Sequence, residues 1–189
     1  MKIFFNTSFL FNIAFKNVIL AAIFLLPLNY VYAEQQGSLG LDSSVGEVEV
    51  AIEISELVKI SNLNDFDFTN WNRIDDMEQS DLLCVYSNGA RGAYRVSARG
   101  TGIRENFEVT DGTNNVPFKV FWEDDINSGA NGRMLIANRS MRMTNANIED
   151  FECNGNLNAK LTIAFLSRDL SGAFVSTYRG TVIITIMPE

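Results

Sequence analysis

The chain has 189 residues, of which 47% are hydrophobic and 20% charged, and its 23 acidic residues outnumber 15 basic ones to give a formal net charge of −8. This charge argues against nucleic acid or an anionic membrane surface as a partner, because both are bound through basic patches. Histidine is absent, which excludes Ser-His-Asp and Cys-His catalysis and every metal site that contains histidine.

The first 33 residues have the features of a cleaved secretory signal. Lys2 and Lys16 lie on the amino-terminal side of the apolar run VILAAIFLLPL at 18–28. The sequence VYA then places Val31 and Ala33 at the −3 and −1 positions of a signal-peptidase site. The run contains Pro27 and is much shorter than the roughly 20 residues that span a bilayer. We therefore expect cleavage after Ala33 and no stable membrane insertion; the alternative is an uncleaved membrane anchor.

Residues 34–46 are small and polar and predict a flexible leader, and 47–189 are expected to form a single domain. That domain opens with EVEVAIEI at 47–54, which alternates apolar and mostly acidic residues. Alternation with a period of two predicts a half-buried strand. The residues that share its apolar face are Val48, Val50, Ile52 and Ile54.

Further strands are predicted along the rest of the chain, at 57–63, 82–87, 93–99, 105–109, 116–122, 133–137, 158–166 and 173–187, the last bent at Gly180. Clusters of Gly, Asn and Asp at 87–92, 111–115, 127–132 and 153–156 predict the turns between them, because these residues tolerate positive φ. Short helical turns are predicted within 70–81 and 141–152. Many short strands separated by turns indicate an all-β protein, and we expect an immunoglobulin-like antiparallel β-sandwich.

The only two cysteines are Cys84 and Cys153. An even number of cysteines in an exported protein predicts a disulfide bond, which here would close a loop of about 70 residues and stabilise the fold by on the order of 4 kcal/mol. The alternative is a pair of buried free thiols. Two cysteines without histidine cannot fill a tetrahedral zinc shell, so neither a metal nor a cofactor is expected.

Acidic residues gather at 72–81 and 123–127 on predicted loops. Paired carboxylates can hydrolyse glycosides when they lie about 5 to 10 Å apart. Asp124, Asp125 and Asn127 also offer oxygen ligands for calcium, but their spacing misses the usual loop pattern. Solvation of loops explains the acids more simply, and we predict that the protein is not an enzyme.

The aromatic residues separate by strand parity. Trp122 shares the inward face of its predicted strand and is expected in the core. Phe121 and Ile183 have the opposite parity, which makes them better candidates for a second apolar surface that contacts a partner.

Five stretches together resemble a known family: LVKISNLNDFDF (57–68), DLLCVYSNGARGAYRVSARGTG (81–102), VPFKVFWED (116–124), CNGNLNAKLTIAF (153–165) and YRGTVIITIMPE (178–189). Their order is similar to that of small secreted bacterial proteins of the fimbrial-subunit and spore coat protein U type, over most of the chain after the predicted signal. The resemblance implies an immunoglobulin-like sandwich exported with a periplasmic chaperone and an outer-membrane usher. It also implies polymerisation, in which the amino-terminal extension of one subunit supplies a strand that its neighbour lacks.

Carried over to this chain, the resemblance implies a non-enzymatic structural subunit, pilin-like or coat-like, in the periplasm, cell surface or fimbrium of a Gram-negative bacterium. Its partners would be the chaperone, the usher and like subunits. The residues implied in strand complementation are Val48, Val50, Ile52 and Ile54 on the donor side and Val182, Ile184 and Ile186 on the acceptor side. The alternative is that 47–54 is the first strand of a complete sandwich, which would act as a secreted binding module or adhesin. A hydrolase using Asp124 and Asp125 is the third hypothesis.

Overall fold

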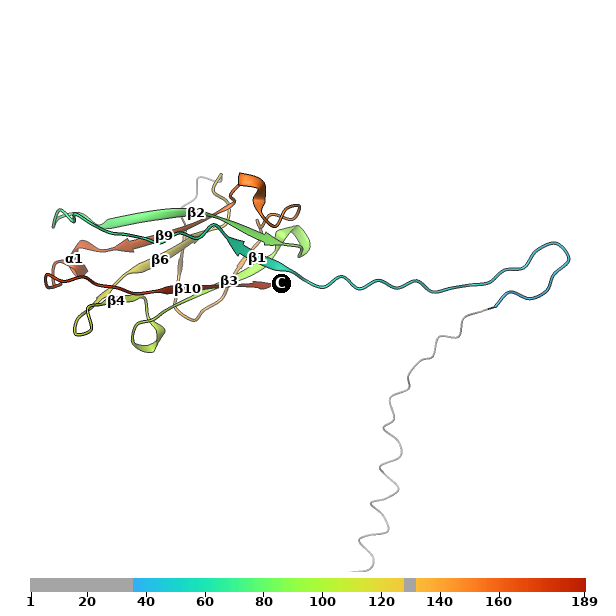
Figure 1. The fold of residues 1–189 in the computed structure, drawn as a ribbon, viewed down its shortest axis with the longest axis horizontal. Helices are drawn as coiled ribbons and strands as arrows, with labels where there is room; N and C mark the ends of the chain where they lie inside the picture. The colour runs from blue at the N-terminus through green and yellow to red at the C-terminus, as the bar shows by residue number, and fades with distance from the viewer. Residues whose placement is uncertain (1–35, 128–131) are drawn as a thin grey trace, which may run out of the picture. The chain divides into compact units, whose positions relative to one another are not determined.

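The computed structural model describes residues 36–127 and 132–189, and the predicted signal at 1–33 lies outside the described residues. The chain divides into two units at Glu53, and the second unit, Ile54–Glu189, is an antiparallel β-sandwich (Figure 1). Within the described part, no helix is long and apolar enough to cross a membrane.

Two sheets form the sandwich, and every neighbouring pair of strands in them is antiparallel. The larger sheet has the order β1 (Val58–Ser61), β2 (Met77–Ser87), β9 (Ala159–Phe165), β6 (Lys119–Glu123) and β7 (Arg133–Leu135). The smaller has the order β10 (Val182–Pro188), β3 (Tyr94–Gly100) and β8 (Met141–Met143). A separate hairpin joins β4 (Glu108–Thr110) to β5 (Asn115–Pro117), and α1 (Ser167–Leu170) is a single helical turn.

The core lies between the two sheets, where alternate residues of their strands meet. Val85 of β2, Val96 of β3 and Val120 of β6 are fully buried, and so is Trp122, as predicted. The Trp122 indole N–H donates a hydrogen bond of 3.0 Å to the hydroxyl of Tyr94 in the opposite sheet. Burial raises the pKa of Tyr94 above its usual range, so the phenol remains a neutral partner for the indole.

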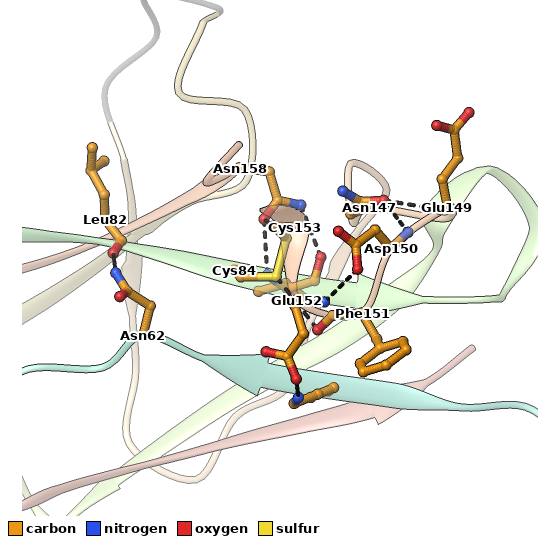
Figure 2. The surroundings of a disulfide bond; sticks show 12 residues. Asn62, Leu82, Cys84, Asn147, Glu149, Asp150, Phe151, Glu152, Cys153 and Asn158 are labelled. Atoms are coloured by element: carbon orange, nitrogen blue, oxygen red, sulfur yellow. Dashed lines mark hydrogen bonds and ion pairs between the residues drawn. A yellow bond between two sulfur atoms is a disulfide. The ribbon is translucent and has the colours of Figure 1, made fainter. Parts of the chain in front are cut away.

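The predicted disulfide joins Cys84 of β2 to Cys153 in the short 3₁₀ turn Cys153–Gly155 (Figure 2). Asn158 fastens the same region, because its side chain accepts from the Val85 N–H at 2.8 Å and donates to the Val85 carbonyl at 2.9 Å. On the other side, Glu152 forms an ion pair with Lys59 of β1. The segment between β8 and β9 is thereby tied to both β1 and β2.

Several predicted elements are wrong. Residues 48–57 form no helix or strand, so the strand predicted at 47–54 does not belong to this sandwich. An alternating sequence shows that a segment can form a β-strand, but the strand forms only where a neighbouring strand pairs with it. The helical turn predicted within 70–81 is replaced by the start of β2, because 77–83 pair with β9. The turn predicted within 141–152 is replaced by β8, which pairs with β3.

The bounds of several predicted strands differ from the observed ones; the strand expected at 105–109, for example, begins only at Glu108. Two predicted strands also change their pairing partner along their length. The strand expected at 116–122 is divided at Phe118 into β5 and β6, which belong to different sheets. The strand expected at 173–187 begins only at Val182. Just before it, Arg179 bridges to Thr110 of β4, so the chain changes its pairing partner from β4 to β3 around Gly180, where the bend was expected.

Candidate strand-acceptor edge

The two sheets have four edge strands of unequal character. β7 and β8 have three residues each, and short edges are a common protection against association. β10 has seven residues, none of them charged, and in the described part of the chain it pairs only with β3. A long apolar edge of this kind is a site of association unless something covers it.

The inward side chains of β10 are incompletely buried. Ile186 lies opposite Val96, which is 0% exposed, and Ile184 lies opposite Ala98, which is 2% exposed. Residues directly opposite each other in a ladder project from the same face of the sheet. Ile184 and Ile186 nevertheless remain half-buried, so the inner face of this sheet is covered at β3 and left partly open at β10.

The edge of the larger sheet that lies beside β10 also has incompletely buried inward side chains. Ile60 of β1 lies opposite the fully buried Val85, and Val58 lies opposite the fully buried Ser87, yet both β1 residues are half-buried. Strands β1 and β10 lie side by side, with Cα atoms within 8 Å, but they belong to different sheets (Figure 1). We call the partly exposed side chains of these two edges the apolar seam: Val58, Ile60, Val182, Ile184 and Ile186.

Beyond β1, side chains rather than a ladder hold the chain along β2. Asn62 adopts a positive φ of 63°, which ends the strand, and its side chain donates to the Leu82 carbonyl at 2.7 Å (Figure 2). Further along, Gln79 donates to the Asp67 carbonyl at 2.8 Å. This path brings Phe68 against Phe165 in an edge-to-face contact at 5.0 Å, and it extends the partly buried apolar surface past the end of β1.

Asn88 controls how the chain enters β1. Its backbone N–H donates to the Leu57 carbonyl at 3.2 Å, and its side chain accepts from the Leu57 N–H at 2.6 Å and donates to the Ser55 carbonyl at 2.9 Å. Residues 55–57 therefore continue the line of β1 past the end of β2. Sequence reasoning missed this role, for which the only signal was the SNG turn that contains Asn88.

The predicted donor and acceptor residues differ in their surroundings. Val182, Ile184 and Ile186 lie together on β10 and join Val58 and Ile60, which sequence reasoning did not select. The predicted donor residues Val48, Val50, Ile52 and Ile54 are 74 to 87% exposed and belong to no strand.

The acidic residues considered for catalysis or calcium binding accept hydrogen bonds from nearby groups of the chain. Asp124 accepts hydrogen bonds from the Thr144 N–H at 3.1 Å and the Asn145 side chain at 3.3 Å. Asp125 accepts from the Asn127 N–H at 3.1 Å, and the turn predicted at 127–132 lies mostly outside the described residues. Across 36–127 and 132–189, no three His, Cys, Asp or Glu side chains are grouped to hold a metal ion.

The residues of opposite parity lie on the outer faces of the sheets. Phe121 is half-buried and lies opposite Met134 of β7, whereas Ile183 is half-buried and lies opposite Arg99 of β3. They are therefore on different sheets and do not form one surface.

No protein-family model and no curated protein matches the chain. One similar solved structure is described as a chaperone–tip adhesin complex vital for synergistic activation of CFA/I fimbriae biogenesis, with a TM-score of 0.50 and 10% identity over 70% of this chain and 41% of that chain. Another is the CsuC–CsuE chaperone–tip adhesion subunit pre-assembly complex from archaic chaperone-usher Csu pili of Acinetobacter baumannii, with a TM-score of 0.44 and 13% identity over 71% of this chain and 40% of that chain. The matches thus span about two fifths of those chains. With the sheet order above, the first likeness identifies the fold as an all-β, immunoglobulin-like sandwich.

Proposed function

We propose that this protein is a non-enzymatic structural subunit, pilin-like or coat-like, that assembles at the bacterial cell surface by β-strand complementation. The observation that carries the proposal is the apolar seam, in which Ile184 and Ile186 stay half-buried beside the buried Val96 and Ala98. A strand added at β10 would cover these side chains and complete the inner face of the sheet.

The backbone of β10 offers the matching hydrogen bonds. In an antiparallel pair, alternate residues direct their N–H and C=O groups to the partner strand, and the residues between them direct these groups to the other side. A seven-residue strand therefore has three or four residues whose groups face its free edge. An added strand would satisfy them, which is the way that β-augmentation provides affinity.

The segment 47–54 has the properties that such a donor requires. Its apolar residues alternate with polar ones, it is one residue longer than β10, and its side chains are exposed. The three hydrogen bonds of Asn88 hold 55–57 in line with β1. A return of the same chain onto its own β10 would have to reverse within these residues and break those bonds, which favours donation to another molecule.

The proposed assembly implies which proteins would be the partners of this chain. Like subunits would exchange strands, and a periplasmic chaperone would cover the seam until a neighbour replaces it, with an outer-membrane usher as the site of exchange. The fold likeness to a structure described as a chaperone–tip adhesin complex supports this proposal. The protein would then work in the periplasm, at the cell surface or in a fimbrium of a Gram-negative bacterium, and strand exchange needs no cofactor.

The test compares the exported chain, Glu34–Glu189, with its Val50→Asp/Ile52→Asp variant by size exclusion and by unboiled gels. We expect the parent to form ladders that resist detergent and the variant to lose them. The matched control is Leu39→Asp/Leu41→Asp, which changes two apolar residues that are even more exposed and lie outside the proposed donor. A stable, cooperatively folding monomer that is unaffected by deletion of 34–54 would contradict the proposal and favour a self-complete binding module or adhesin.

A further inference from the structure

The outer face of the β10–β3–β8 sheet carries a row of arginines. Arg95 and Arg99 project from β3 and lie two positions on either side of Ser97, and Arg142 of β8 lies opposite Arg95. Their side chains are 43%, 46% and 58% exposed. The segment 36–57, by contrast, contains five acidic residues and no lysine or arginine: Asp42, Glu47, Glu49, Glu53 and Glu56.

Building on the function proposed above, we propose that residues 47–54 of a second copy of this chain dock on β10 in one register. Ala51 lies opposite Thr185 in that register. Glu49 and Glu53 then face Arg95 and Arg99, which select this donor by charge.

The inward faces match in this register. With Ala51 opposite Thr185, the four apolar donor residues lie opposite the four inward positions of β10, which are Val182, Ile184, Ile186 and Pro188. A shift of one residue would turn the apolar face of the donor to solvent. A shift of two would leave one apolar donor residue beyond the end of β10.

The outward faces match as well. Thr185 lies opposite Ser97, so the proposed register forms a row of three small residues with Ala51. On β3 the arginines lie two positions before and after Ser97, and on the donor the glutamates lie two positions before and after Ala51. The match is symmetric about this row and therefore holds for either direction of the donor strand.

The reach is sufficient, although β10 lies between donor and β3. Two strand spacings separate their Cα atoms by about 10 Å, which extended Glu and Arg side chains can bridge together. The present ion pairs do not prevent this. Arg99 pairs with Glu105 at 3.1 Å, and exposed pairs of this kind contribute little stability. Arg95 pairs at 2.9 Å with Glu189, which is partly buried. Glu189 also pairs with Arg142 at 2.7 Å and keeps that partner if Arg95 turns to the donor.

Cysteine cross-linking tests the register. The full chain has only the two disulfide-bonded cysteines, so an introduced cysteine is the sole free thiol. Chains carrying Ala51→Cys are mixed with chains carrying Thr185→Cys and oxidised mildly, and we expect a covalent dimer. Chains carrying Ala51→Cys are also mixed with chains carrying Ile183→Cys or Met187→Cys, which report a shift of two residues. These mixtures should give at least several-fold less covalent dimer. A dominant cross-link at either of these would overturn the register while leaving strand complementation intact.

Placing both substitutions in one chain tests whether the donor segment on β10 comes from a second copy or from the same chain. Ala51→Cys/Thr185→Cys should give covalent multimers at all accessible concentrations. Closure into a covalent monomer would show that the chain complements itself, which would overturn the second-copy occupant.

Charge selection is tested with a labelled peptide of residues 45–56, titrated into the full chain carrying Val50→Asp/Ile52→Asp. We expect the Glu49→Lys/Glu53→Lys peptide to bind about 3- to 10-fold more weakly at low salt, and to recover most of this loss on a chain that also carries Arg95→Glu/Arg99→Glu. The matched control peptide carries Glu47→Lys/Glu56→Lys, with the same change in net charge, and should bind within about twofold of the parent peptide. Equal binding of the parent and Glu49→Lys/Glu53→Lys peptides would overturn charge selection alone. Absence of binding by every peptide, together with absence of every cross-link, would instead refute the proposed function.

Discussion

Removal of the Cys84–Cys153 disulfide should lower the stability of the sandwich by a predictable amount. The bond joins residues 69 positions apart, and the loss of chain entropy that it imposes on the unfolded state corresponds to about 4 kcal/mol. This is a large share of the roughly 5 to 15 kcal/mol by which a domain is usually stable. For a domain of this size, 1 kcal/mol moves the melting temperature by roughly 3 to 5 °C, so we expect the midpoint to fall by roughly 12 to 20 °C.

The assay is thermal unfolding followed by far-ultraviolet circular dichroism, comparing the oxidised chain with Cys84→Ala/Cys153→Ala. Both proteins should carry Val50→Asp/Ile52→Asp, because proposed assembly through the donor segment would stabilise the folded state by mass action and obscure the difference. Alanine is chosen because both cysteines are 1% exposed and a serine would bury a hydroxyl there. The parent chain melted in a reducing buffer is the second measurement.

The reasoning also predicts where the effect arises. Asn158 still holds the segment between β8 and β9 to Val85 when the disulfide is absent. The folded structure should therefore persist, and the free energy should be lost mainly through the unfolded state. A drop of less than about 1 kcal/mol, with a native spectrum, would refute the loop-entropy estimate for this chain.

Three further predictions concern single side chains. Asn158→Ala removes three side-chain hydrogen bonds to backbone groups and should cost about 2 to 4 kcal/mol in urea unfolding, with an unchanged dependence on urea concentration. Hydrogen bonds from two backbone N–H groups of its own turn lower the pKa of Asp111 to about 2. Asp111 should therefore contribute stability above about pH 4, and this contribution should be lost as the pH falls toward 2. Carboxyl chemical shifts measured by NMR would report the pKa of Asp111. Gly100→Ala should destabilise by about 1 to 3 kcal/mol because its new Cβ would collide with the Asn106 carbonyl, whereas Gly172→Ala, which meets nothing closer than 4.0 Å, should change the melting temperature by less than a few degrees.

Strands in the middle of the sheets were the most predictable parts of this fold. The predictions at 93–99 and 158–166 nearly coincide with β3 and β9, because both strands have two neighbours and pack apolar residues inward along their length. The same parity placed Trp122 in the core correctly. Where a strand is buried on one face throughout, local alternation and tertiary packing favour the same structure.

Strands that form because a neighbouring strand pairs with them, although their own sequence lacks apolar alternation, were less predictable. The first five residues of β2, MEQSD at 77–81, contain a single apolar residue and gave no strand signal. They form a strand because β9 supplies a ladder for them. Asn158 was missed for a related reason, since its hydrogen bonds with Val85 join residues that are 73 positions apart, and no local motif marks such a pair.

The candidate edge was predictable in part. The alternation of Val182, Ile184 and Ile186 marked an apolar face, but a sequence pattern does not state whether a neighbouring strand covers that face. Val58 and Ile60 show this limit most clearly: their strand was predicted, and only their residual exposure beside buried partners identifies them as part of an open seam.

The unequal edges also constrain the form of the proposed assembly. Of the four edge strands, β7 and β8 are short and each contains an arginine, which discourages pairing. β1 and β10 lie side by side, so a single added strand would contact both, and no second apolar edge of comparable length would remain among the strands that the structure describes. Each chain would then have one donor segment and one acceptor edge, formed by different residues. A head-to-tail contact of this kind propagates into an open filament unless its rotation closes a ring. Added donor peptide should therefore shorten the ladders progressively, because each peptide occupies one acceptor and ends one filament.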